Sequence, residues 1–178
     1  METKILKPNN INITEEPLSK VTLCFQCKKC SGGCPVSESM DLLPHQVMRL
    51  IQLGLDEEIF KNKTIWICAS CETCSTRCPN DIEIASVMDE LRKLSSEKGD
   101  VSEKDIELFH KLFLGEVKMM GRVHELSLIG KHKLFTATFF KDMKMGMKMF
   151  LKNKLKLFPK WIKGRKAIKN IFKNSEKK

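Results

Sequence analysis

The chain has 178 residues, and 42% of them are hydrophobic, which is enough for one compact domain with an appendage. No apolar run approaches the roughly 20 residues of a membrane-spanning helix, so we do not expect one. The first 20 residues also lack the apolar stretch and cleavage site of a signal peptide. We therefore expect a cytoplasmic protein whose thiols stay reduced.

The net charge of +10 is unevenly distributed. Residues 1–100 carry 12 Lys and Arg against 15 Asp and Glu, whereas residues 101–178 carry 20 against 7. This asymmetry indicates a chemical role for the first part and a docking role for the second. It predicts three segments: an N-terminal arm over 1–20, a cysteine-containing domain over 21–100, and a basic extension over 101–178.

The N-terminal arm is polar and contains Pro8 and Pro17, which predicts an extended segment. The next segment holds all eight cysteines in two C-x2-C-x2-C-x3-C-P motifs, CFQCKKCSGGCP at 24–35 and CASCETCSTRCP at 68–79. Each cysteine of the first motif has a counterpart 44 residues later. A uniform offset at four positions indicates an internal repeat.

Helices are predicted between and after the motifs. Apolar residues recur at helical spacing after Pro44 until Gly54, and again from Ile84 until Gly99. A further helix is expected to begin near Ser102 and to continue through residues 106–113. No segment alternates as a strand does, so the predicted fold class is mainly α.

The basic extension contains a second kind of pattern. Residues 134–158 place Phe139, Met143, Met147 and Phe150 on one face of a helix with lysines beside them, and Pro159 ends the pattern. Residues 160–178 repeat this mixture less regularly. We favour docking onto a partner subunit over contact with a membrane surface. A helix packed only on its own domain is a further alternative, and no motif that reads nucleic acid accompanies the charge.

The cysteine spacing favours iron–sulfur chemistry. Thiolates are soft ligands for zinc, copper(I) and iron–sulfur clusters. A cubane cluster takes three thiolates from a tight loop with two-residue gaps and a fourth from elsewhere, and both motifs fit that requirement. Zinc motifs usually separate their CxxC pairs by about ten or more residues, and a disulfide scaffold does not suit the compartment. We therefore predict two [4Fe–4S] clusters.

A rule for two-cluster ferredoxins assigns the ligands, because there the fourth cysteine of this run ligates the other cluster. Transferred to this chain, the rule gives the first cluster Cys24, Cys27, Cys30 and Cys78. It gives the second cluster Cys68, Cys71, Cys74 and Cys34. Pro35 and Pro79 would turn the chain from one cluster toward the other.

Side chains around the motifs allow two interpretations. Gly32 and Gly33 are expected to let backbone amides approach the first cluster. Lys28, Lys29 and Arg77 could tune a potential, although solvated surface charges are the commoner case. Phe25 and Trp66 fit either a shield for a cluster or ordinary core.

No catalytic centre is visible beside the motifs. All eight cysteines are used as ligands, and the histidines are scattered at positions 45, 110, 124 and 132. Neither a phosphate-binding glycine loop nor a zinc protease motif occurs. The sequence thus predicts a protein that carries electrons without converting a substrate itself.

The two motifs, with WICASCETCSTRCP as the second, resemble the α-helical ferredoxin module. That module occurs in iron–sulfur subunits of succinate dehydrogenase, fumarate reductase and anaerobic glycerol-phosphate dehydrogenase. With FQCKKCSGGCP as the first motif, the chain is most similar to the C subunit of heterodisulfide reductase from methanogens and related anaerobes. The resemblance covers residues 20–98, with weaker likeness in GRVHELSL (121–128) and FKDMKMGMKMF (140–150).

The resemblance implies a non-catalytic electron-transfer subunit of a multisubunit oxidoreductase of methanogenesis. In that family, electrons pass from a flavin-bearing, cluster-rich subunit to a catalytic subunit with CCG motifs, which reduces the disulfide of coenzyme M and coenzyme B. This chain has no adjacent cysteine pair, so it lacks the CCG signature. The alternatives are an iron–sulfur relay of a flavin dehydrogenase or quinone-linked enzyme and, in a different class, a zinc-stabilised nucleic-acid-binding module.

Overall fold

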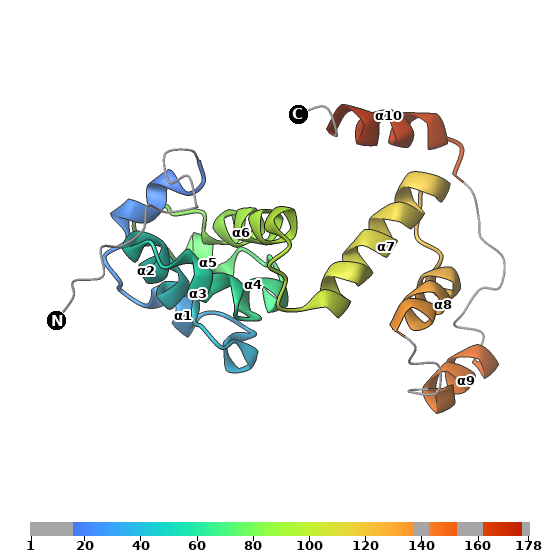
Figure 1. The fold of residues 1–178 in the computed structure, drawn as a ribbon, viewed down its shortest axis with the longest axis horizontal. Helices are drawn as coiled ribbons and strands as arrows, with labels where there is room; N and C mark the ends of the chain where they lie inside the picture. The colour runs from blue at the N-terminus through green and yellow to red at the C-terminus, as the bar shows by residue number, and fades with distance from the viewer. Residues whose placement is uncertain (1–15, 137–142, 153–161, 176–178) are drawn as a thin grey trace. The chain divides into compact units, whose positions relative to one another are not determined.

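The computed structural model describes residues 16–136, 143–152 and 162–175, and within these ranges it contains helices, turns and bends but no strand (Figure 1). The predicted mainly-α class is therefore confirmed. The chain divides into two compact units, which we call unit 1 (Met1–Glu103) and unit 2 (Lys104–Lys178).

Unit 1 is built from short helices around two longer ones. In chain order they are η1 (Ser19–Leu23), α1 (Lys29–Gly32), η2 (Ser37–Ser39), α2 (Pro44–Leu53), α3 (Asp56–Phe60), α4 (Thr64–Ile67), α5 (Thr73–Thr76) and α6 (Ile84–Lys98). Leu18, just before η1, is 4% exposed, so ordered packing begins before residue 21. Most of the predicted arm, residues 1–15, lies outside the described residues.

The two longer helices begin and end where the sequence indicates. Helix α2 has Pro44 at its first position, and the Leu43 amide donates to Gln46 Oε1 at 2.8 Å, which closes its first turn. It ends at Gly54, whose φ of 69° is the left-handed conformation that glycine adopts at no steric cost. Helix α6 ends in the same way at Gly99, with φ of 76°.

The core of unit 1 is formed by the apolar faces of α2 and α6 together with the helices between them. Its fully buried side chains include Val21, Val47, Met48, Ile51, Ile59, Ile65, Ile82, Val87, Met88 and Leu91. Each contributes about 1.5–3 kcal/mol of burial free energy. Contacts between α1 and α5, α1 and α2, and α5 and α6 join the cysteine motifs to this core.

The internal repeat is visible in the backbone. Gln26 and Ser70, which lie 44 residues apart, have φ of 62° and 47°. Lys28 and Glu72, related by the same offset, have φ of 64° and 60° and precede α1 and α5. The two motifs therefore share a loop conformation as well as a spacing.

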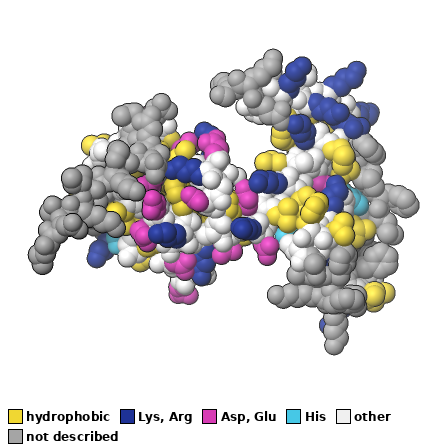
Figure 2. Space-filling view, viewed as in Figure 1, with side chains coloured by type: hydrophobic (Ala, Val, Ile, Leu, Met, Phe, Trp, Pro, Cys, Tyr) yellow, Lys and Arg dark blue, Asp and Glu magenta, His cyan; other side chains and the backbone are white. Residues whose placement is uncertain are grey.

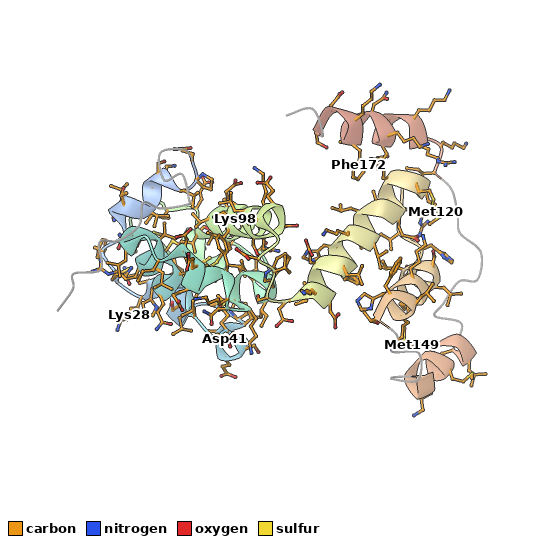
Figure 3. All side chains as sticks on the ribbon, viewed as in Figure 1. Lys28, Asp41, Lys98, Met120, Met149 and Phe172 are labelled. Carbon is orange, nitrogen blue, oxygen red and sulfur yellow. The ribbon has the colours of Figure 1, made fainter. Side chains whose placement is uncertain are left out.

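Unit 2 consists of α7 (Lys104–Met120), α8 (Glu125–Thr136), α9 (Met143–Leu151) and α10 (Arg165–Ser175). Helix α7 contacts both α8 and α10. Phe172 lies on the side of α10 that faces α7, with Lys118 Nζ 5.9 Å from the centre of its ring (Figure 3). A helix was predicted over 134–158, and the structure describes only part of that segment. Residues 137–142 and 153–161 lie outside the described residues.

Charged side chains differ between the units. On the face shown in Figure 2, acidic and basic side chains are mixed over unit 1, whereas Lys and Arg predominate over the described surface of unit 2. Among the described residues, no helix is both long and apolar enough to cross a bilayer.

Candidate iron–sulfur centres

The loops that carry the cysteines are held in an uncommon conformation. Gln26, Lys28, Ser70 and Glu72 all have positive φ although none is glycine, and each such residue costs about 1–2 kcal/mol. A left-handed residue reverses the local chain direction, so it changes where the cysteines on either side of it point. Strain of this kind persists where a functional site needs it.

One pocket brings together the four thiols predicted for the second cluster. Its lining includes Cys68, Cys71 and Cys74 from the second motif and Cys34 from the first. Pro44, Ala85 and Met88 supply apolar walls. Four soft donors in one pocket fit the needs of a [4Fe–4S] cluster, with three from a loop and one from outside it.

For the four thiols predicted for the first cluster, the structure shows two partial links. Cys24 adds to the rise in the pKa of Cys30, which burial mainly causes. Asn80, two residues after Cys78, donates a hydrogen bond to the carbonyl of Leu23, the residue before Cys24. The end of the second motif therefore lies against the start of the first. The ligand assignment itself stays a prediction.

Burial sets the ionisation of several thiols. It raises the pKa of Cys30, Cys68 and Cys74, and the nearby Cys34 adds to the rise at Cys68. At Cys71, which is exposed, a hydrogen bond with Thr73 Oγ1 at 3.4 Å lowers the pKa instead. Because clusters bind thiolates, loading the sites with iron and sulfide must release protons.

Polar side chains surround the first motif. Gln26 Nε2 donates to Cys24 Sγ at 3.3 Å, and the buried Ser31 hydroxyl lies 3.8 Å from Cys30 Sγ. His45 holds that hydroxyl in place, since its Nδ1 is 2.7 Å from Ser31 Oγ and its amide donates to the same oxygen at 3.1 Å. Burial and the charge of Lys28 lower the pKa of His45. Sequence reasoning missed His45, because the contact joins residues 14 positions apart across a loop.

The second motif has a related but different set of neighbours. Ser75 Oγ accepts a hydrogen bond from the Ala85 amide at 3.3 Å, as Ser31 Oγ does from His45 at the start of α2. Ser70 donates to Asp89 Oδ1 at 2.9 Å and accepts from Arg92, which also pairs with Asp89. A network of charged residues therefore lies beside Cys68. Within it, Arg92 and Asp89 have opposing effects on the pKa of Cys68, since Arg92 lowers that pKa and Asp89 raises it.

Other predicted neighbours have been placed by the structure. Trp66 is 5% exposed and belongs to the core, whereas Phe25 is 63% exposed and is not core, so its role as a shield for a cluster stays a prediction. A Cβ at Gly33 would lie 2.7 Å from Cδ and Nη1 of Arg77, so the Arg77 side chain would have to move if residue 33 were not glycine. Arg77 is the repeat equivalent of Gly33, so the two motifs meet at corresponding positions.

The site and the helical fold together define a class of protein. Residues 23–83 match the family model of the 4Fe-4S dicluster domain. The span covers both motifs, and eight cysteines are the number that two cubane clusters require. Unit 1 therefore contains a 4Fe-4S dicluster domain, and its cofactors are two [4Fe–4S] clusters, as predicted.

The chain is also similar in sequence to several curated proteins. The chain is 36% identical over 85 residues to the iron-sulfur C subunit of the CoB–CoM heterodisulfide reductase of Methanopyrus kandleri, covering 48% of this chain and 44% of that protein. It is 29% identical over 99 residues to the C2 subunit of the same reductase from Methanocaldococcus jannaschii, covering 56% and 53%. It is also 34% identical over 76 residues to the C subunit of the H(2):CoB-CoM heterodisulfide,ferredoxin reductase of Methanothermobacter marburgensis, covering 43% and 41%.

These comparisons confirm the predicted resemblance to the iron–sulfur C subunit of heterodisulfide reductase. The chain spans about half the length of the curated relatives it matches.

Proposed function

We propose that this chain is the electron-relay iron–sulfur subunit of a heterodisulfide reductase complex. It would take electrons from a flavin-bearing, cluster-rich subunit and deliver them to a catalytic subunit that reduces the disulfide of coenzyme M and coenzyme B. The observation that carries the proposal is the similarity of about half of this chain to proteins named as the iron–sulfur C subunit of that reductase, together with the dicluster match over residues 23–83.

The roles of this chain's own residues follow from the site. Cys24, Cys27, Cys30 and Cys78 would hold one cluster, and Cys68, Cys71, Cys74 and Cys34 the other. When bound, such clusters accept and release single electrons. Gln26, Ser31 and Thr73 would donate hydrogen bonds to ligand sulfurs and so favour the reduced state. No cysteine remains as a nucleophile, so disulfide chemistry would take place on a partner.

Unit 2 would serve as the docking part of the subunit. Its described surface carries exposed apolar side chains, including Phe113, Leu114, Leu134 and Phe135. Lysines dominate the charge of this part of the chain. Exposed apolar and basic residues together suit contact with an acidic protein surface.

The first test is the iron and acid-labile sulfide content of the full chain prepared without oxygen. We expect about eight of each per chain. A Cys74→Ser variant is the matched control and should lose about half of both. Zinc in place of iron would contradict the proposal and favour the nucleic-acid-binding alternative.

The second test addresses the partner. The dithionite-reduced chain is mixed with a catalytic heterodisulfide reductase subunit, and oxidation of the clusters is followed by their visible absorbance. We expect oxidation only after the coenzyme M–coenzyme B disulfide is added. Oxidation by a quinone in anionic liposomes, with no response to the disulfide, would instead favour a quinone-linked relay.

A further inference from the structure

The internal repeat makes the surroundings of the two clusters directly comparable. Helices α1 and α5 begin at repeat-equivalent residues, and the loops before them share their left-handed positions. Backbone contributions to the two cluster environments are therefore closely matched. A difference between the clusters must come mainly from side chains at equivalent positions.

The largest such difference is one of charge. Lys28 and Lys29 lie between Cys27 and Cys30, whereas Glu72 and Thr73 lie between Cys71 and Cys74. One loop thus carries two positive charges and the other a negative charge. Lys28 projects from the surface of unit 1 (Figure 3), yet its charge still acts at His45, which hydrogen-bonds Ser31 beside Cys30.

Other charged groups also lie near the motifs. Arg92, beside Cys68, is paired with Asp89, which opposes the effect of Arg92 on the pKa of the Cys68 thiol without cancelling it. Arg77 lies over Gly33, and these residues directly precede Cys78 and Cys34, which belong to different ligand sets. Acidic residues follow both fourth cysteines, since Glu38 comes after Cys34 and Asp81 after Cys78.

Hydrogen bonds to sulfur are also present on both sides. The first motif has Gln26 on Cys24 and Ser31 on Cys30. The second has Thr73 on Cys71 and the hydroxyl of Ser75 acting on Cys74. The clearest difference between repeat-equivalent positions is therefore the charge inversion between the two loops.

Reduction adds one negative charge to a cluster, and a nearby positive charge stabilises that state. We propose that the inversion between Lys28–Lys29 and Glu72–Thr73 gives the cluster of the first motif the higher reduction potential. One electron shared between the clusters then resides mainly on the first, and transfer from the second to the first is downhill. The step moves one electron and changes no covalent bond or proton. This inference rests on the proposed relay function and adds a direction to it.

The test is a redox titration of the iron-loaded full chain, with dithionite as reductant and electron paramagnetic resonance as the readout. A Cys27→Ser variant identifies the signal of the first cluster, because Cys27 belongs to that cluster under either ligand assignment. In the unaltered chain we expect the first cluster to be reduced first.

Two charge reversals at equivalent positions test the cause. Lys28→Glu should lower the midpoint of the first cluster, and Glu72→Lys should raise that of the second. Each should reduce the ratio of electron occupancy by about threefold to tenfold at low salt, where tenfold corresponds to about 59 mV. Lys28→Arg keeps the charge and should leave both midpoints unchanged. High salt should shrink the shifts, because exposed charges are screened.

The outcomes separate this inference from the function on which it rests. Samples without iron would overturn the relay function and this inference with it. Samples with about eight irons in which the second cluster is reduced first, or in which both reversals leave the midpoints unchanged, would overturn only the inference.

Discussion

Cys34 ends the first motif but lines the pocket of the second. If its thiolate completes the second cluster, Cys34→Ala should damage that cluster and leave the first largely intact. Cys78→Ala is the matched control and should have the opposite effect. Resonance spectra of the two iron-loaded variants would distinguish these outcomes. Loss of the first cluster in the Cys34 variant would mean that each motif binds its own cluster alone.

At individual residues, the sequence predicted the cofactors but not the backbone conformation or the contacts around the cysteines. The spacing of the cysteines and the following prolines predicted the cofactors, because ligand geometry requires that pattern. It did not predict positive φ at Lys28 and Glu72, since neither residue type favours that conformation. Nor did the sequence predict that the Arg77 side chain lies against Gly33. Such contacts depend on how the repeats pack, which no local pattern records.

At the scale of single elements, one glycine inside α7 and one directly after it should respond in opposite ways to replacement by alanine. Gly115 lies in the middle of α7 on its exposed side, with open space at its Cβ position. Gly115→Ala should therefore stabilise unit 2 by about 0.5–1 kcal/mol. Gly121 follows the helix with φ of 83°, and a Cβ there would meet Ile162. Gly121→Ala should therefore destabilise it by about 1–2 kcal/mol. Urea unfolding followed by circular dichroism checks both, and equal effects would contradict the assigned helix end.

A buried ion pair joins α7 to α8. Glu116 is 1% exposed, and it accepts hydrogen bonds from Lys131 at 2.7 Å and from Ser127 at 2.6 Å. Burial alone would raise the pKa of Glu116, but these two donors hold it below its ordinary value. Since the folded pKa is depressed, the pair stabilises unit 2 above about pH 4.3 and loses that effect as pH falls through the folded pKa.

An exposed ion pair within α7, between Lys111 and Glu107, provides a matched control. Lys111 also contacts a carboxylate at 2.7 Å, but its side chain is 64% exposed. Lys131→Ala should lower the free energy of unfolding by about 1–3 kcal/mol at neutral pH. Lys111→Ala should change it by less than about 0.5 kcal/mol. Urea midpoints at neutral pH and near pH 3 test this, because the difference between the variants should shrink in acid.

The helices show which patterns carry information. Helices α2, α6 and α7 were predicted, because each has a regular apolar face and α2 and α6 also end at a glycine. Helix α8 was missed: Leu128 is buried, but Ile129 and Leu134 are exposed, so no apolar face marks it. Helix α9 lies within the predicted segment 134–158, and its described side chains Met147 and Leu151 are exposed.

For the whole molecule, the division after Glu103 makes a prediction about iron removal. Cluster binding stabilises the state that holds the ligands, and all eight cysteines lie in unit 1. Chelation of iron from the full chain should therefore increase hydrogen exchange in α2 and α6 while leaving α7 and α8 unchanged. Exchange measured by mass spectrometry gives both in one sample. Equal loosening of both units would contradict their independence.

The charge of the chain changes near residue 100, and the contacts place the boundary between the two units after residue 103, while the predicted roles of the three segments stay predictions. Composition can indicate such a boundary because acidic residues outnumber basic ones over residues 1–100, whereas basic residues predominate over 101–178. The placement of one unit against a partner is not encoded in such an average, since it depends on the shape of both surfaces.

The 44-residue repeat has an implication for the origin of the domain. Under the crossed assignment, each half supplies three ligands to one cluster and one ligand to the other. A single half could not complete a cluster, but two identical copies related by a two-fold axis would complete two. An ancestral homodimer followed by gene fusion would yield the present arrangement, and only after fusion could the equivalent positions Lys28 and Glu72 acquire opposite charges.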